Sequence, residues 1–165
     1  MAQPVIKHRA LCQDQWQLLR DGDAVPAQGQ LIVSLECWQT QRQALLERGS
    51  PLGIWLGCDQ PPELIAADLP HFALIAIHFP TFTDGRGYSY ARLLRDHYRY
   101  AGELRALGDI GLDQIYFLGR CGFDSLVLPE SLDPDSALAA FDDFTAPYQG
   151  ASDDPQPLFR RHQRG

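Results

Sequence analysis

The stretch FALIAIH at residues 72–78 decides the fold, because its first six residues are all apolar. A strand that is apolar on both faces is typical of a parallel sheet with helices over both sides. We therefore expect residues 72–78 to form an interior strand of such a sheet. Apolar and helical patterns alternate before and after this stretch and predict the neighbouring elements.

Short apolar runs predict four further strands, at residues 31–35, 52–56, 103–107 and 125–128. Helical patterns fill the intervals and follow the last strand, at residues 36–48, 62–68, 88–101, 109–120 and 135–144. Such alternation is typical of an α/β fold with right-handed crossovers. The predicted fold is α/β, with about five mostly parallel strands alternating with helices. Since five units are too few to close an eight-stranded barrel, we expect an open sheet or a partial barrel.

The two ends of the chain follow different patterns. Residues 5–8 and 14–18 are short, partly alternating runs, which predict an N-terminal antiparallel hairpin. Turn residues without periodicity make up residues 147–165, which we expect to form a flexible C-terminal tail. A chain of 165 residues is long enough for one folded domain, which we place at residues 1–146.

Composition argues against several classes of protein. The net charge of −7 disfavours nucleic-acid binding, because phosphate contacts need a basic face. No apolar stretch approaches the ~20 residues that span a bilayer, and the N-terminus lacks the apolar run of a secretory signal. We therefore expect a cytoplasmic protein that does not enter a membrane. The four cysteines show no C-x-x-C spacing, so no metal site is expected. Because the chain also has no recognisable nucleotide-binding loop, no other cofactor is expected.

The loop FTDGRGYS at residues 82–89 is the most suggestive local sequence. In a parallel sheet it lies at the carboxyl edge and opens a helix, where backbone N–H groups and a forked arginine bind anions. The candidate anion-binding residues are Thr83, Asp84, Gly85, Arg86 and Gly87, together with Arg92, Arg105 and Asp109. The alternative is a tight turn in which Asp84 caps the backbone and Arg86 is solvated. The loop matches neither a P-loop nor a dinucleotide-binding fingerprint.

Charge is distributed unevenly along the chain. Residues 86–105 hold five arginines against two acids, whereas residues 121–157 hold eight acids and no lysine or arginine. Such asymmetry steers charged partners over roughly a Debye length, ~8–10 Å. The acidic segment is either a docking face for a basic partner or a surface that keeps the protein soluble. Its candidate docking residues are Asp135, Asp142 and Asp143.

No catalytic residue stands out in the sequence. Neither a Ser-His-Asp nor a Cys-His-Asn arrangement is indicated, and no pair of carboxylates differs from the general acidity of the chain. Cys121 follows the C-terminal end of a predicted helix, where the helix dipole disfavours a thiolate, so we interpret it as structural. The residues alone leave open whether the protein is an enzyme.

Four motifs cover the central part of the chain. They are F-x-D-G-R-G at residues 82–87, A-R-x-L-R at 91–95, G-x-x-R-A-x-G-D at 102–109 and R-C-G-F-D at 120–124. In these motifs the chain resembles a bacterial family, the domain-of-unknown-function family numbered 934. It departs from none of them.

The resemblance implies a role in sulfur assimilation. Members of the family tend to be encoded beside the haemoprotein component of assimilatory sulfite reductase, and are often labelled oxidoreductases. We therefore expect an accessory protein that docks or assembles this haemoprotein with its electron donor. The alternative is a small enzyme or sensor that binds an oxyanion at residues 84–87. The resemblance supplies no catalytic residue.

Overall fold

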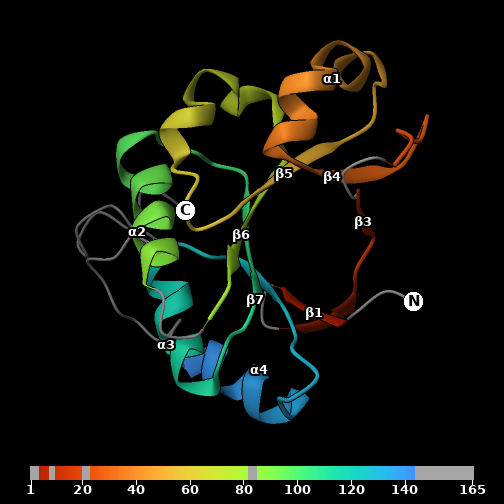
Figure 1. The fold of residues 1–165 in the computed structure, drawn as a ribbon. Coiled ribbons are helices and arrows are strands. Elements are labelled where there is room, and N and C mark those ends of the chain that lie inside the picture. Colours follow the sequence, from red (N-terminus) through yellow and green to blue (C-terminus); the bar gives the residue numbers. More distant parts are fainter. Residues whose placement is uncertain (1–3, 8–9, 20–22, 82–84, 144–165) are drawn as a thin grey trace, which may run out of the picture.

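The computed structural model describes residues 4–7, 10–19, 23–81 and 85–143. Of Asp142 and Asp143 it describes the backbone alone. Within these residues one mixed sheet of eight strands is open and curled (Figure 1). The strands follow the order β2-β1-β8-β7-β6-β5-β4-β3 across the sheet. Their bounds are β1 (Pro4–Lys7), β2 (Ala10–Gln13), β3 (Trp16–Leu18), β4 (Gln30–Ser34), β5 (Leu52–Leu56), β6 (Leu74–Phe79), β7 (Glu103–Gly108) and β8 (Ser125–Val127).

The strands β3 to β8 run parallel to one another, and β1 pairs antiparallel with both β8 and β2. The five strands predicted from apolar runs are β4 to β8, so the α/β prediction with parallel strands is confirmed. The strand β3 adds a sixth parallel strand that the sequence patterns did not predict.

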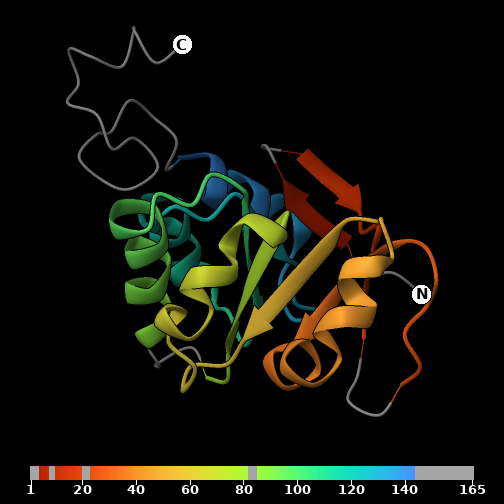
Figure 2. The same cartoon turned by 90° about the horizontal axis from the view of Figure 1, so that it is seen from above.

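The helices of the described residues cover one face of the sheet. They are α1 (Leu35–Glu47), the 3-10 helix η1 (Pro62–His71), α2 (Arg86–Arg92) with its π-helical continuation η2 (Leu93–His97), α3 (Leu112–Cys121) and α4 (Pro134–Asp143). Each strand from β4 to β8 joins the sheet next to the preceding strand and in the same direction. Right-handed crossovers then place every connecting helix on the same face. In Figures 1 and 2 the helices accordingly lie outside the curled sheet.

The two faces of the sheet therefore have different surroundings. Side chains of the convex face, such as Ile54 and Ile75, pack with the helices in the main hydrophobic core. Side chains of the concave face, such as Leu74 and Ala76, form a smaller cluster against which Trp16 packs. The expectation of helices over both sides is wrong, because the curl brings residues of the sheet's own edge over the concave face.

The predicted N-terminal hairpin is present, but its second strand is not where the sequence placed it. The hairpin joins β1 to β2, with Val5 opposite Cys12, whereas residues 16–18 form β3 at the other edge of the sheet. The Asp14 side chain accepts the backbone N–H of Trp16 at 3.0 Å, a local turn that separates the two strands. Because the sheet curls, a linker of two residues reaches from one edge to the other.

The helix predicted over residues 88–101 begins earlier and ends earlier. It starts at Arg86, widens into the π-helical turn η2, and stops at His97. Arg99 then takes a left-handed conformation with φ of 57°. A π-helical turn shifts the following side chains around the helix, and His97, at its end, is exposed.

The predicted boundary between a domain at residues 1–146 and a tail at 147–165 lies outside the described residues. Among the helices that are described, none is long and apolar enough to cross a membrane.

Candidate functional site

The predicted anion loop lies at the carboxyl edge of the sheet. Gly85 precedes α2, and Arg86 is the first residue of this helix, a few residues after β6. Asp109 directly follows β7, and its backbone N–H donates to the carbonyl of Phe79 at 2.8 Å. The edge therefore brings Gly85, Arg86 and Asp109 into the same region. Thr83 and Asp84 lie outside the described residues.

Cys58 is a neighbour of this loop that the sequence analysis did not single out. The Nη2 of Arg86 donates to Cys58 Sγ at 2.9 Å, and the hydroxyl of Tyr90 donates to the Cys58 carbonyl at 2.5 Å. Cys58 comes two residues after β5, so the predicted strand end at residue 56 already placed it at this edge. Arg86 is exposed, but its guanidinium is held against the end of β5.

Gly87 has a packing role in the structure. The residue is buried, and a Cβ added to it would lie 2.6 Å from Cζ of Phe79 and 3.1 Å from Cγ2 of Ile77. Only a glycine lets the first turn of α2 approach β6 so closely. The packing of α2 against β6 therefore explains the glycine at position 87 without an anion.

Two other predicted residues lie apart from the loop. Arg92 is exposed at the end of α2, six residues after Arg86, or about 9 Å further along a helix that rises 1.5 Å per residue. Arg105 lies in the middle of β7, in register with Ala76 and Ser125. Its side chain belongs to the concave face, so the structure does not bring it to the residues around Arg86.

Arg105 is the centre of a buried polar network on the concave face. The residue is only 3% exposed, and its Nη1 and Nη2 pair with Asp14 at 2.7 Å and Glu103 at 3.0 Å. Its Nε donates to Ser125 Oγ at 3.2 Å. Lys7 Nζ completes the network at 2.8 Å from Glu103. Two cations therefore balance two carboxylates, which makes the burial of these charges tolerable.

The protonation of Glu103 reflects this network. Burial acts to raise the pKa of Glu103, but hydrogen bonds from Lys7 and Ser125 and the charge of Arg105 outweigh it. The pKa of this carboxyl is therefore lowered from its ordinary value. The ionised form, which Arg105 and Lys7 need as a partner, is the form that the folded protein stabilises.

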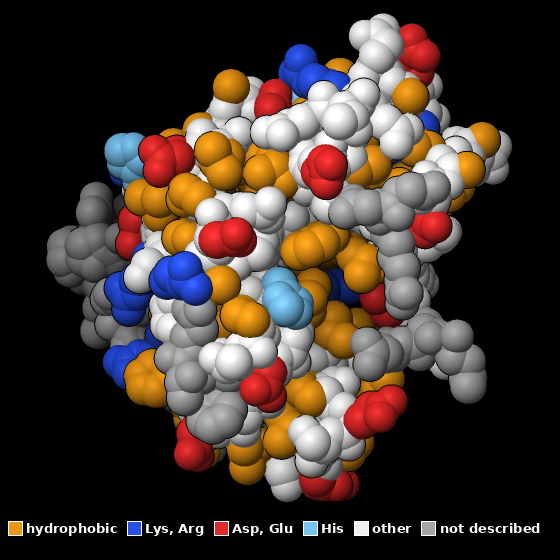
Figure 3. Space-filling model, in the orientation of Figure 1, with side chains coloured by type: hydrophobic (Ala, Val, Ile, Leu, Met, Phe, Trp, Pro, Cys, Tyr) orange, Lys and Arg blue, Asp and Glu red, His pale blue; other side chains and the backbone are white. Residues whose placement is uncertain are grey.

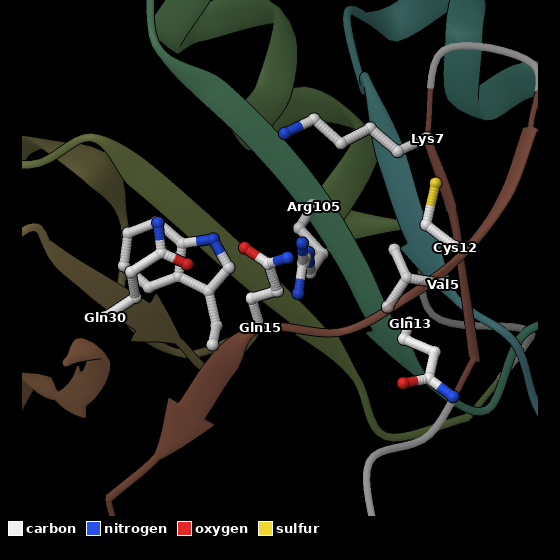
Figure 4. A pocket seen from close by; sticks show the side chains of 8 residues that line it. Val5, Lys7, Cys12, Gln13, Gln15, Gln30 and Arg105 are labelled. Carbon is white, nitrogen blue, oxygen red and sulfur yellow. The ribbon is translucent and has the colours of Figure 1, made fainter.

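A cavity of about 240 Å³ opens beside this network on the concave face. Figure 4 shows Arg105 near the middle of this pocket, among side chains from both edges of the sheet. In Figure 3 the molecule is hollowed to the right of its centre, with charged side chains at the bottom of the hollow. The residues that line the pocket include Val5, Lys7, Gln15, Trp16, Gln30 and Arg105.

A second arginine of the motifs, Arg95, holds four segments of the chain together. Its Nη1 donates to the carbonyls of Tyr100 and Gly102, both at 2.8 Å. Its Nε and Nη2 donate to the carbonyl of Gly122 at 3.0 and 2.8 Å. Nη2 also pairs with Asp124 at 2.7 Å. All the N–H groups of this guanidinium are directed at the protein, so Arg95 is structural.

Gly122 and Cys121 lie at the end of α3, next to the residues that Arg95 holds together. Gly122 ends α3 with φ of 109°, and a Cβ there would lie 2.6 Å from Cγ of Arg95. Cys121 is buried at 5% exposure beneath it. The R-C-G-F-D motif thus has an architectural explanation, in agreement with the interpretation of Cys121 as structural.

The predicted docking residues belong to α4. Asp135 is exposed in the first turn of this helix, after Asp133, whose carboxylate accepts the backbone N–H of Ser136 at 3.0 Å. The backbone of α4 extends through Asp142 and Asp143, but their side chains lie outside the described part of the chain. Basic side chains gather elsewhere, at the left of Figure 3 over α2.

An exposed apolar surface lies on α3, the helix against which α4 packs. Leu112, Tyr116 and Phe117, which we call the α3 patch, are 38%, 44% and 53% exposed. Phe117 also contacts Tyr88 of α2 edge to face, with 6.3 Å between the ring centroids. The sequence patterns did not predict this surface, although the i, i+4 spacing of Leu112 and Tyr116 on the predicted helix places them on one face.

The described residues contain no group of three or more His, Cys, Asp or Glu side chains arranged to hold a metal ion.

Comparison with known families matches residues 53–159 to a bacterial protein family of unknown function, DUF934. The chain belongs to this family. No curated protein matches the chain. In this DUF934 protein the matched segment begins in β5 and includes the loop at Arg86, the Arg95 cluster and the α3 patch.

Proposed function

We propose that this protein is an accessory protein of assimilatory sulfite reduction that docks the sulfite reductase haemoprotein, or assembles it with its electron donor. The resemblance to a family whose members are encoded beside that haemoprotein supports the choice of partner. The observation that carries the docking role is the α3 patch beside the acidic helix α4.

The composition of this surface suits a protein partner. Interface centres are rich in aromatic side chains, which bury a large area at a small cost in conformational entropy. Tyr116 and Phe117 supply such a centre, and Asp135 supplies negative charge on the neighbouring helix α4. A partner with an apolar centre and a basic rim would be complementary, and opposite charges would accelerate its association.

Binding to the immobilised haemoprotein tests this role. Phe117→Ala is expected to weaken binding by more than tenfold, in the range of ~2 kcal/mol that defines an interface hot spot. Leu64→Ala is the matched control, because Leu64 is also apolar and 49% exposed but lies on η1. Equal binding by the two variants and the wild type would contradict docking through α3.

Charge provides an independent test of the same interface. Replacing Asp135, Asp142 and Asp143 by asparagine is expected to slow association at low salt and to reduce its dependence on salt. Glu63→Gln is the control, because Glu63 is an exposed acid on η1. Binding of the wild type that is indifferent to salt would count against the acidic segment as a docking face.

The alternative function is binding of a small oxyanion at the carboxyl edge. One observation favours it: Gly85, Arg86 and Asp109 share this edge, and Arg86 is exposed there. Arg86→Ala is then expected to weaken binding of sulfite, sulfate or phosphate by more than about tenfold, as for a charge-assisted pair. An unchanged titration with all three anions would rule this alternative out.

A further inference from the structure

The concave pocket, rather than the loop at Arg86, has the construction of a small-molecule site. Side chains from β1, β2, the linker between β2 and β3, β3, β4 and β7 line it, so both edges of the curled sheet contribute. Its volume of about 240 Å³ lies below the ~300–1,000 Å³ typical of pockets for drug-sized ligands. A compact ligand fits this volume, whereas a dinucleotide or a flavin does not.

The floor of the pocket offers hydrogen-bond donors. An arginine carries five N–H groups, and Arg105 directs one each at Ser125, Asp14 and Glu103. Each of its two terminal nitrogens keeps a second N–H group without an acceptor among the described residues. The guanidinium is nearly completely buried, so these N–H groups cannot rely on bulk water.

The walls and the mouth of the pocket add further donors. Trp16 is half-buried, and its indole N–H has no partner in the described part of the protein. The side-chain amides of Gln15 and Gln30 likewise have no hydrogen bond within the described residues. In Figure 4 these glutamines lie on the same side of Arg105. The N–H groups at this site that have no partner among the described residues therefore favour a ligand rich in hydrogen-bond acceptors.

Charge selects among such ligands. Arg105 and Lys7 are already balanced by Asp14 and Glu103, so the pocket has no net positive charge with which to compensate a polyanion. A single carboxylate accepts two parallel N–H bonds from a guanidinium at the lowest electrostatic cost. Amide side chains then bond the uncharged part of the ligand.

The geometry points to a binding site on the concave face, at Arg105, Trp16 and Gln30, for a small monocarboxylate with a polar, uncharged body. This site is separate from the α3 patch and from the residues around Arg86. Because its walls come from both edges of the sheet, an occupant would tie the linker at Asp14 and Gln15 to β7.

N-acetylglycine is a suitable probe, because it combines one carboxylate with one amide. Its titration is followed by the indole N–H signal of Trp16 in ¹H–¹⁵N NMR spectra of the full chain. We expect a saturable shift with a Kd of about 1 mM or below. The neutral analogue N-acetylglycinamide and the dianion sulfate are expected to bind at least about tenfold more weakly.

Variants at the rim keep the buried charges intact and so preserve the fold. Gln30→Ala is expected to weaken binding about fivefold, as for one lost hydrogen bond, while the control Gln43→Ala on α1 leaves binding unchanged. Arg105→Lys keeps the charge but removes the fork, and is expected to abolish the preference for the carboxylate over its amide. No saturable shift with N-acetylglycine, equal binding of the neutral analogue, or tighter binding of sulfate would each overturn the site.

Discussion

At the scale of single residues, Arg95 and Arg105 explain much of the motif sequence through the architecture they support. Arg95 joins η2 to the segments around Tyr100, Gly102 and Gly122. Arg105 joins β7 to β8 and to the linker at Asp14. Both are surrounded by backbone carbonyls or carboxylates that would lose a charged hydrogen-bond donor without them.

Removing Arg95 is expected to destabilise the protein strongly. Arg95→Ala removes this donor from three carbonyls and breaks the ion pair with Asp124, and should lower the free energy of unfolding by about 3 kcal/mol or more. Arg92→Ala is the matched control on the same helix, because Arg92 is exposed, and should change stability by less than about 0.5 kcal/mol. Urea unfolding measures both, and equal midpoints would contradict the structural role of Arg95.

Glu103 predicts a specific loss of stability in acid. Its pKa is lower in the folded protein than its value of 4.5 without these interactions, so its contribution is present above about pH 4.5 and disappears as the pH falls through the folded pKa. The Glu103→Gln variant should therefore be less stable at neutral pH and lose less stability on acidification. Unfolding curves across this pH range test it. Parallel losses for wild type and variant would show that Glu103 is not responsible.

The sequence predicted which types of residue make up these sites, but not where the residues lie in space. The five arginines of residues 86–105 were visible in the sequence, but which of them converge depends on strand register and on which face of the sheet each occupies. Arg105 alternates onto the concave face, whereas Leu104 and Ala106 face the helices. No local pattern reports that the sheet curls, so the network with Asp14 was not predictable.

At the scale of elements, the approach of α2 to β6 depends on a single missing side chain. Gly87→Ala would place a Cβ 2.6 Å from Phe79, and is expected to cost about 1–3 kcal/mol through overpacking. Gly85→Ala is the control, because a Cβ at Gly85 meets nothing within 4 Å and its φ of −91° suits any residue. Thermal or urea unfolding distinguishes them. Similar stabilities would show that helix–strand packing does not explain Gly87.

The strands of the parallel sheet were predictable because each is a short apolar run bounded by turn residues. The boundaries of the helix at 86–97 were not, since the π-helical turn depends on packing rather than on local preference. The hairpin was predicted in kind, but its second strand was misplaced, because the alternating residues 14–18 belong partly to the linker and partly to β3. The short β2 is exposed along its whole length, so its residues do not show the alternation of a half-buried strand.

At the scale of the whole molecule, the sequential order of β4 to β8 determines how the surfaces are divided. All the described helices lie on the convex side, so α3 and α4 present the exposed apolar and acidic groups together there. The concave side holds the neutral polar network and the pocket at Arg105. A partner protein and a small ligand would therefore bind to opposite faces of the sheet.

Hydrogen–deuterium exchange of the full chain, alone and with the sulfite reductase haemoprotein, tests the proposed docking most directly. The account predicts slower exchange of backbone amides in α3 and α4, with β2 and β3 unchanged. The Phe117→Ala variant should lose this protection, and the Leu64→Ala variant should keep it. Exchange that is unchanged by the haemoprotein, or slowed only at the edge strands β2 and β3, would contradict docking through the α3 patch.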